Sequence, residues 1–284
     1  MILILYFASL CGVLLPAAMA LYGAGLCSLG FGLACKREAF SFLRHPGFWA
    51  FAALSVWIAV RVRGILPDQY DNYTHWALIM KTMYQTDALP APGSLVTFTD
   101  YPPAAALLGY FVMRCTEFGE DVMLTAQGLL AAAAVSSLFV GCSWRRPWRC
   151  LFALLAGAAM LSVIPMNLEN LYVDSLLGYL ASAAVMIFYG SREGGVRCGA
   201  SVCIVLSVLI LTKQSGALFA AFVLLTDLLL RLAFGGRGRL GRFLGFLPEL
   251  LLPVLCRALF SLRVQRVFGG DSGTGADVSY AGAL

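Results

Sequence analysis

The chain has 284 residues, of which 60% are hydrophobic and 12% are charged, and its mean hydropathy is +0.83. A soluble domain carries about 25% charged residues, so this composition excludes an ordinary soluble protein. The net charge of +5 comes from basic residues in short loops, with no basic and aromatic stripe, so nucleic acid is not an expected partner. Nine scattered cysteines without a CxxC pair, and only two histidines, do not indicate a zinc site.

Long uncharged segments predict an all-α fold, namely a polytopic transmembrane helical bundle with about eight spans. The expected spans lie near residues 5–30, 47–66, 121–143, 150–167, 174–191, 198–212, 215–232 and 243–261. Two interpretations of residues 1–35 stay open, one long helix or a helix followed by a kinked second pass near Gly23–Gly32. The N-terminus lacks a basic region and its apolar run is long, which argues against a signal peptide.

This pattern divides the chain into four parts. Residues 1–66 are expected to hold N-terminal transmembrane helices, and residues 67–120 a large external loop with amphipathic helices. Residues 121–261 are expected to form the main transmembrane bundle. Residues 262–284 are rich in glycine and small residues and predict a flexible tail.

Four basic clusters set the orientation, because cytoplasmic loops are rich in Lys and Arg. They are Lys36-Arg37 with Arg44, Arg145-Arg146 with Arg149, Arg192 with Arg197, and Arg231 with Arg237-Arg239-Arg242. With these clusters inside, the external acidic residues sit in loops rather than in the middle of spans. Arg61 and Arg63 fit this orientation least well, and either snorkel or contact a headgroup or ligand phosphate.

Residues 68–84, DQYDNYTHWALIMKTMY, gather polar chemistry in the predicted external loop. One face of this segment repeats apolar and aromatic residues at helical spacing: Tyr73, Trp76, Ala77, Met80 and Tyr84. We therefore expect an interfacial helix whose aromatic face lies on the outer leaflet. Residues 103–117 predict a second amphipathic or re-entrant helix at the outer surface.

Three ionisable residues on the external side suggest chemistry. Asp71 lies where it either caps the interfacial helix or acts on a substrate. Asp174 begins a span and Lys213 interrupts an apolar stretch, and their structural alternatives are a helix cap and a snorkelling side chain. A carboxylate can serve as a general base, and a lysine can bind phosphate as a point charge. The pattern favours transfer of a sugar from a lipid phosphate to an acceptor outside the membrane.

Five segments carry a family resemblance in chain order. They are DNYTHW at 71–76, YPPAAALLGYF at 101–111, EFGEDVMLTAQGLL at 117–130, YVDSLLGYL at 172–180 and LTKQSGALF at 211–219. Together they resemble the GT-C superfamily of membrane glycosyltransferases, especially the family 39-like group with aminoarabinose transferases and protein O-mannosyltransferases. Asn72 departs from the family pattern, which has a second acid there, and the chain is shorter than such enzymes, as a truncated relative would be.

The resemblance implies a site and a donor. Asp71 would be the catalytic base and the donor a polyprenyl-phosphate sugar. The implied substrate-binding residues are Asp68, His75, Trp76, Tyr101, Pro102, Pro103, Asp174 and Lys213. Family 39 relatives do not generally require a metal, so no cofactor is expected, although some other GT-C enzymes use a divalent metal.

The expected function is therefore a membrane glycosyltransferase of the cell envelope, multi-pass in a bacterial plasma membrane. It would modify a glycan, lipid or protein acceptor on the extracytoplasmic side. Two alternatives stay open. A lipid-linked glycan transporter or flippase subunit would show internal repeats and mid-span ionisable residues, which the sequence does not display. A catalytically inactive, truncated membrane protein is the other.

Overall fold

The computed structural model describes residues 1–35, 37–162, 166–191, 197–233 and 239–269, and every regular element within these ranges is helical. The predicted all-α class is therefore confirmed. The α-helices are α1 (Ile2–Leu10), α2 (Leu14–Cys35), α3 (Pro46–Val62), α4 (Ala77–Thr86), α5 (Ala104–Cys115), α6 (Glu120–Val135), α7 (Pro147–Ser162), α8 (Met166–Glu169), α9 (Asp174–Ser191), α10 (Arg197–Ile210), α11 (Gly216–Ala233) and α12 (Arg239–Phe268). Three further helical turns are η1 (Arg37–Arg44), η2 (Asn72–Trp76) and η3 (Ser136–Phe139).

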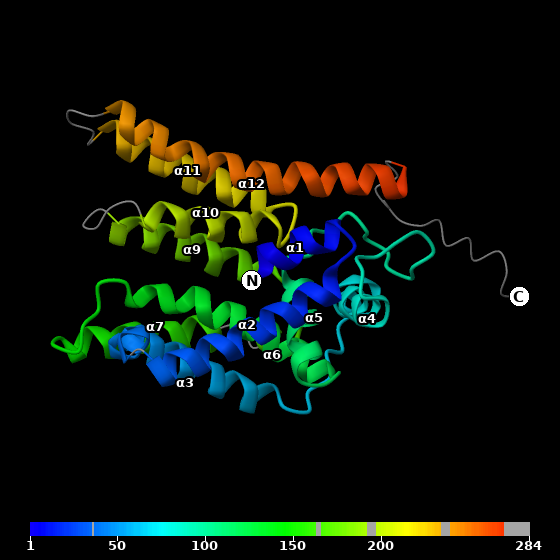
Figure 1. Ribbon diagram of the computed structural model, residues 1–284, viewed down its shortest axis with the longest axis horizontal. Coiled ribbons are helices and arrows are strands. Elements are labelled where there is room, and N and C mark those ends of the chain that lie inside the picture. The colour runs from blue at the N-terminus through cyan, green and yellow to red at the C-terminus, as the bar shows by residue number, and fades with distance from the viewer. Residues whose placement is uncertain (36, 163–165, 192–196, 234–238, 270–284) are drawn as a thin grey trace, which may run out of the picture.

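The long helices lie roughly side by side, with α4 at one end of the assembly (Figure 1). One group consists of α9, α10, α11 and α12, which contact one another in sequence and across the group. The other group is built around α6, which contacts α3 and α5 and also reaches α9. A single apolar core therefore joins both groups, and α6 lies at their junction.

The end of the molecule that carries α4 (Figure 1), here called the acidic end, brings together Glu120 and Asp121 of α6 with Glu169 of α8. Gly64, after α3, donates its N–H to Asp121 Oδ2 at 3.0 Å. Lys81 of α4 pairs with Glu120, and Arg61 pairs with Glu169. These contacts connect the ends of α3, α4, α6 and α8, so helices distant in sequence deliver their acidic ends to one place.

Two helices are long and apolar enough to cross a membrane, Leu14–Ala34 and Glu120–Phe139. Six more apolar helical stretches have 10–17 residues: Pro46–Val62, Ala104–Cys115, Pro147–Ser162, Asp174–Tyr189, Gly199–Ile210 and Gly216–Leu229. Length and composition thus identify two candidate spans in the described chain.

The N-terminal segment differs from both expectations. The helix breaks at residues 11–13, where Gly12 has a φ of +73°, and α2 then continues unbroken from Leu14 to Cys35. A positive φ is easily adopted by glycine and ends α1. The predicted kink near Gly23–Gly32 is wrong, because these glycines lie inside a regular helix and do not need an unusual backbone.

The predicted membrane-facing surface of residues 68–84 is also wrong. Trp76, Ala77 and Met80 are 5%, 3% and 1% exposed and belong to the protein core, whereas Tyr73 is 59% exposed. The predicted helical spacing is confirmed, but the apolar face packs against protein and not against lipid. The reason is α5, which packs against α4 and fills the place expected for lipid.

The helix predicted at the outer surface from residues 103–117 is buried as well. In α5 the run from Ala104 to Tyr110 is buried without interruption, and the helix contacts α1, α4 and α6. The sequence AAALLGY is small and apolar on all sides, which suits close contact on several faces. This burial fits a helix covered by protein on several sides and not a helix lying on the surface.

The C-terminal half brings two further corrections. Because α12 continues to Phe268, the boundary predicted at residue 262 is too early, while residues 270–284 lie outside the described chain. Acidic residues do occur within the long helices. Asp227 in α11 and Glu249 in α12 are each 2% exposed, and both interact with other groups.

Candidate functional site

The π-helical turn η2 carries the centre of the predicted site. Asp71 directly precedes it, is half-buried, and makes no side-chain capping hydrogen bond, so its interpretation as a simple helix cap is wrong. Inside the turn, His75 is 3% exposed and Trp76 is 5% exposed. Single π turns within helices recur at functional sites.

Asn72 anchors this turn to the loop between α8 and α9. Its Nδ2 donates to Asn170 Oδ1 at 3.0 Å, and its Oδ1 accepts from the Leu171 N–H at 3.2 Å. From α6, Gln127 Nε2 donates to the Tyr172 carbonyl at 3.0 Å and supports the same loop. Position 72, where the resembled family has a second acid, is thus a buried amide with both ends engaged, so no carboxylate pair forms there.

An aromatic cluster encloses the imidazole of His75. Its ring centroid lies 4.9 Å from that of Phe98 and 5.1 Å from that of Tyr101, with both rings edge-on. Tyr101 stacks on Trp76 and on Phe98, each at 5.2 Å. Phe98 has no distinguishing sequence pattern around it, and the loop that carries it is placed by the bond from Thr97 N–H to the carbonyl of Thr74 at 3.1 Å.

Burial in this cluster lowers the pKa of His75 to about 4, with Asp71 opposing the shift and Lys213 adding to it. A charged imidazolium is disfavoured among rings that exclude water. His75 is therefore neutral at pH 7 and does not serve as a cationic phosphate ligand. The influence of Asp71 and Lys213 on one ring also shows that these two residues share the site.

Lys213 and Asp174 form an ion pair across the acidic end, with Nζ 2.6 Å from Oδ1. Next to it, the N–H of Ala104 donates to the carbonyl of Leu211 at 2.7 Å, which ties the start of α5 to the end of α10. Buried Pro102–Pro103 therefore lies beside the turn that carries Lys213. The ion pair gives both residues a partner that neither structural alternative, a helix cap for Asp174 or a snorkelling side chain for Lys213, includes.

Tyr172 belongs to this site although the sequence did not single it out. Desolvation raises the pKa of its phenol, and the carboxylates of Asp71 and then Asp174 raise it further. The phenol thus lies within electrostatic reach of two predicted site carboxylates. Tyr172 is one of eleven tyrosines in the chain, and only its position two residues before Asp174 could have drawn attention to it.

Most predicted site residues come together, and one does not. The tertiary structure gathers Asp71, His75, Trp76, Tyr101, Pro102, Pro103, Asp174 and Lys213 at the acidic end. Asp68 is exposed and has no polar contact within the described chain, which places it at the rim.

Asp71 differs from the neighbouring carboxylates in its charge partners. Four ion pairs occur among the described residues: Arg61 with Glu169, Lys81 with Glu120, Arg114 with Asp87, and Lys213 with Asp174. Asp71 is in none of them. A carboxylate outside the ion pairs is placed to accept a proton from a bound hydroxyl.

Sequence reasoning also missed Arg257, in α12. This arginine interrupts an apolar helix, and its buried Nη1 has no hydrogen-bond partner in the described structure. An arginine at such a position is costly and is itself a sequence signal for function.

The residues present do not point to a resident metal. Among the side chains that the structure describes, no three His, Cys, Asp or Glu residues cluster as a metal site would require.

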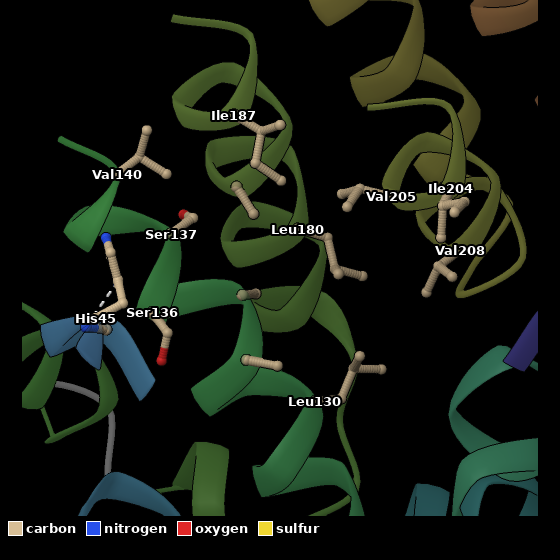
Figure 2. Close-up of a pocket in the computed structure, with 14 residues that line it drawn as sticks. His45, Leu130, Ser136, Ser137, Val140, Leu180, Ile187, Ile204, Val205 and Val208 are labelled. Carbon is tan, nitrogen blue, oxygen red and sulfur yellow. Dashed lines mark hydrogen bonds between the residues drawn. The ribbon is translucent and has the colours of Figure 1, made fainter. Parts of the chain in front are cut away.

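A cavity of about 410 Å³ lies elsewhere, between η3, α9 and α10, and is lined almost entirely by apolar groups such as Leu180, Ile187 and Val205 (Figure 2). His45, at the start of α3, borders this cavity and directly follows Arg44 of a basic cluster. The cavity is therefore separate from the acidic end.

No family model, no curated protein and no solved structure matches this chain.

Proposed function

We propose that this chain is a multi-pass membrane glycosyltransferase of GT-C type that moves a sugar from a polyprenyl-phosphate donor to an acceptor. In this proposal eight helices cross the membrane: α2, α3, α6, α7, α9, α10, α11 and α12. The basic loops face the cytoplasm and the acidic end faces outward. The shorter helices reach across with the help of flanking polar residues and local thinning of the bilayer.

The observation that carries the proposal is the environment of Asp71. Its carboxylate lacks a cationic partner in the described structure, and neutral His75 and Tyr172 lie beside it. A hydroxyl of the acceptor attacks the anomeric carbon of the sugar, and Asp71 takes the hydroxyl proton. The new glycosidic bond forms as the bond from that carbon to the phosphate oxygen breaks, and polyprenyl phosphate leaves. A positioned base supplies about 10²–10⁴-fold in rate.

The other residues of the site have supporting parts in this mechanism. The rings of Trp76 and Tyr101 stack on each other and pack around the imidazole of His75, which fixes the turn that follows Asp71. Asn72 and Gln127 hold the loop that carries Tyr172 in place. Lys213 is already neutralised by Asp174, so its charge on a phosphate is weaker than the sequence suggested.

The test is transfer of labelled sugar from a polyprenyl-phosphate donor in membranes that contain the protein. Asp71→Asn keeps the size of the side chain and removes the base, so transfer should fall by about 10²-fold or more. Glu117→Gln makes the same chemical change at an exposed carboxylate outside the site and should leave transfer intact. Equal transfer by wild type and Asp71→Asn would remove Asp71 from the mechanism.

A second candidate function, a transporter for a lipid-linked glycan, is favoured by Asp227 and Glu249. Both acids are buried within long helices, and ionisable residues at membrane depth mark ion and substrate pathways. Translocation of a fluorescent lipid-linked sugar in proteoliposomes distinguishes the two. Translocation that needs Asp227 and persists in Asp71→Asn would favour the transporter.

A further inference from the structure

The cations at the acidic end divide into two kinds. Arg61, Lys81, Arg114 and Lys213 each pair with a carboxylate. Arg257 does not, since within the described structure it forms no ion pair and its Nη1 is buried without a hydrogen-bond partner. Arg61 and Lys213, which the sequence offered as phosphate ligands, are therefore occupied. Arg63, which it also offered, is exposed at the end of α3, whereas Arg257 is half-buried.

Arg257 lies where α12 meets α1 and the loop before α5. Next to it in the chain, the Cys256 carbonyl accepts a hydrogen bond from the Tyr6 hydroxyl at 2.7 Å, which joins α1 to α12. Six residues further along, Arg263 Nη2 donates to the Pro90 carbonyl at 2.7 Å. Both arginines lie near Tyr6 of α1.

One carboxylate lies near Arg257. Asp100 interacts electrostatically with Arg257 and also accepts a hydrogen bond from Gln214. Asp100 directly precedes Tyr101, and Gln214 directly follows Lys213, so Arg257 borders the candidate site through two of its segments. Arg263 bonds to a backbone carbonyl and not to a carboxylate, so the two guanidinium groups together carry more positive charge than Asp100 offsets.

A partly buried guanidinium with a free donor is ready to bind an anion. Burying a charge without a partner is unfavourable, and an apolar side chain would be more stable in the same place. The planar fork of arginine matches phosphate oxygens with two parallel hydrogen bonds, and such charge-assisted bonds are strong.

We infer that Arg257, with Arg263, forms a phosphate-binding site at the outer half of α12, bordered by α1 and the Pro90–Asp100 loop. This inference rests on the proposed function for its biological source of phosphate, which is the polyprenyl-phosphate donor. The site itself requires only a phosphate group, whether on a lipid or free in solution.

The test measures binding to the full chain in phosphatidylcholine nanodiscs, with polyprenyl phosphate, neutral polyprenol and inorganic pyrophosphate as separate probes. Arg257→Gln should weaken binding of the phosphate probes at least 10-fold, and Arg257→Lys should weaken it less because the charge remains. Arg149→Gln, at an exposed arginine of α7 far along the chain from the proposed site, is the matched control and should bind as wild type does. Neutral polyprenol has no phosphate, so it should bind equally to wild type and to Arg257→Gln.

Thermal stability gives a second readout. Replacing Arg257 should raise Tm if the residue serves a ligand, and should lower Tm if it serves the fold. Without phosphate, Arg257→Met should raise Tm by roughly 2–4 °C, because an unpaired cation is removed. The same variant should lose the increase in Tm that phosphate probes give wild type. A lower Tm together with an unchanged phosphate response would overturn the inference.

The outcomes separate this inference from the proposed function. Binding that depends on Arg257 without any sugar transfer supports the phosphate site and contradicts the transferase. Transfer that needs Asp71 and is indifferent to Arg257→Gln overturns the phosphate site and leaves the transferase standing. Binding of pyrophosphate but not of polyprenyl phosphate supports the site with a soluble phosphate as its ligand.

Discussion

The two helices long enough to span a membrane, Leu14–Ala34 and Glu120–Phe139, differ in their surroundings. The first is 11% buried within the protein and the second 56%. Along α2, large apolar side chains such as Leu26, Phe31 and Leu33 are exposed, whereas α6 contacts α3, α5 and α9. Hydropathy selects both helices equally, but only α6 organises the protein interior, and through Gln127 it supports the candidate site.

Glycine shows the same contrast at single positions. A Cβ at Gly128 of α6 would lie 2.4 Å from Ile58 Cγ2, so this glycine permits close contact with α3. A Cβ at Gly25 of α2 would have no neighbour within 4 Å. Glycine in α6 is thus a packing requirement, while at Gly25 of α2 nothing in the described structure requires it.

The largest expected effect comes from Asn72→Asp, which breaks the hydrogen bond from η2 to the site loop that Gln127 of α6 also supports. The new carboxylate cannot donate to Asn170 Oδ1 and is buried without a cation, so the free energy of unfolding should fall by about 3 kcal/mol or more. Unfolding in detergent, followed by a thiol-reactive dye that reports on buried Cys203 and Cys256, measures the loss.

Gln85→Glu makes the same amide-to-acid change at an exposed position of α4 and serves as its control. That variant should stay within about 0.5 kcal/mol of wild type. Wild-type stability in Asn72→Asp would show that the hydrogen bonds of Asn72 do not hold the loop.

The next effect is the dependence of folding stability on pH that His75 causes. Its pKa is about 4 in the folded protein and about 6.5 in the unfolded chain, so the unfolded chain binds more protons between these values. The contribution of neutral His75 to the free energy of unfolding is therefore fully present above about pH 6.5. It decreases as the pH falls toward 4, by at most about 3 kcal/mol.

Thermal unfolding of wild type and His75→Phe between pH 7.5 and 4.5 measures this effect. The variant should lose part of the acid sensitivity, whereas His45→Gln, at the opposite end, should keep it. An equal decrease in Tm for wild type and His75→Phe would contradict the assignment to His75.

The smallest effect tests the two helices directly. Gly128→Ala forces Ile58 to move and should lower the free energy of unfolding by about 1–3 kcal/mol. Gly25→Ala adds a methyl group in open space and should raise it by about 0.5–1 kcal/mol, the helix-propensity difference between the two residues. A loss in both variants would show that α2 is packed as tightly as α6.

Helix positions could be predicted well where the apolar runs have clear polar ends. The expected span 174–191 coincides with α9, and the span 215–232 differs from α11 by one residue at each end. The break at Gly12 was missed, because its cause is a positive φ at one glycine among twenty-nine. Burial of the aromatic face of α4 was also missed, since periodicity identifies a face but not what covers it.

The sequence by itself determined the helical class, the apolar segments and the gathering of acidic loops at one end, because composition and charge placement act locally along the chain. It also supplied Asp71, His75, Asp174 and Lys213 as candidates. Only the tertiary structure decided their states. Contacts across the fold buried His75, neutralised Lys213 with Asp174 and engaged both ends of Asn72. They left Asp71 and Arg257 outside the ion pairs of the described structure. Charge and burial depend on neighbours distant in sequence, which no local pattern specifies.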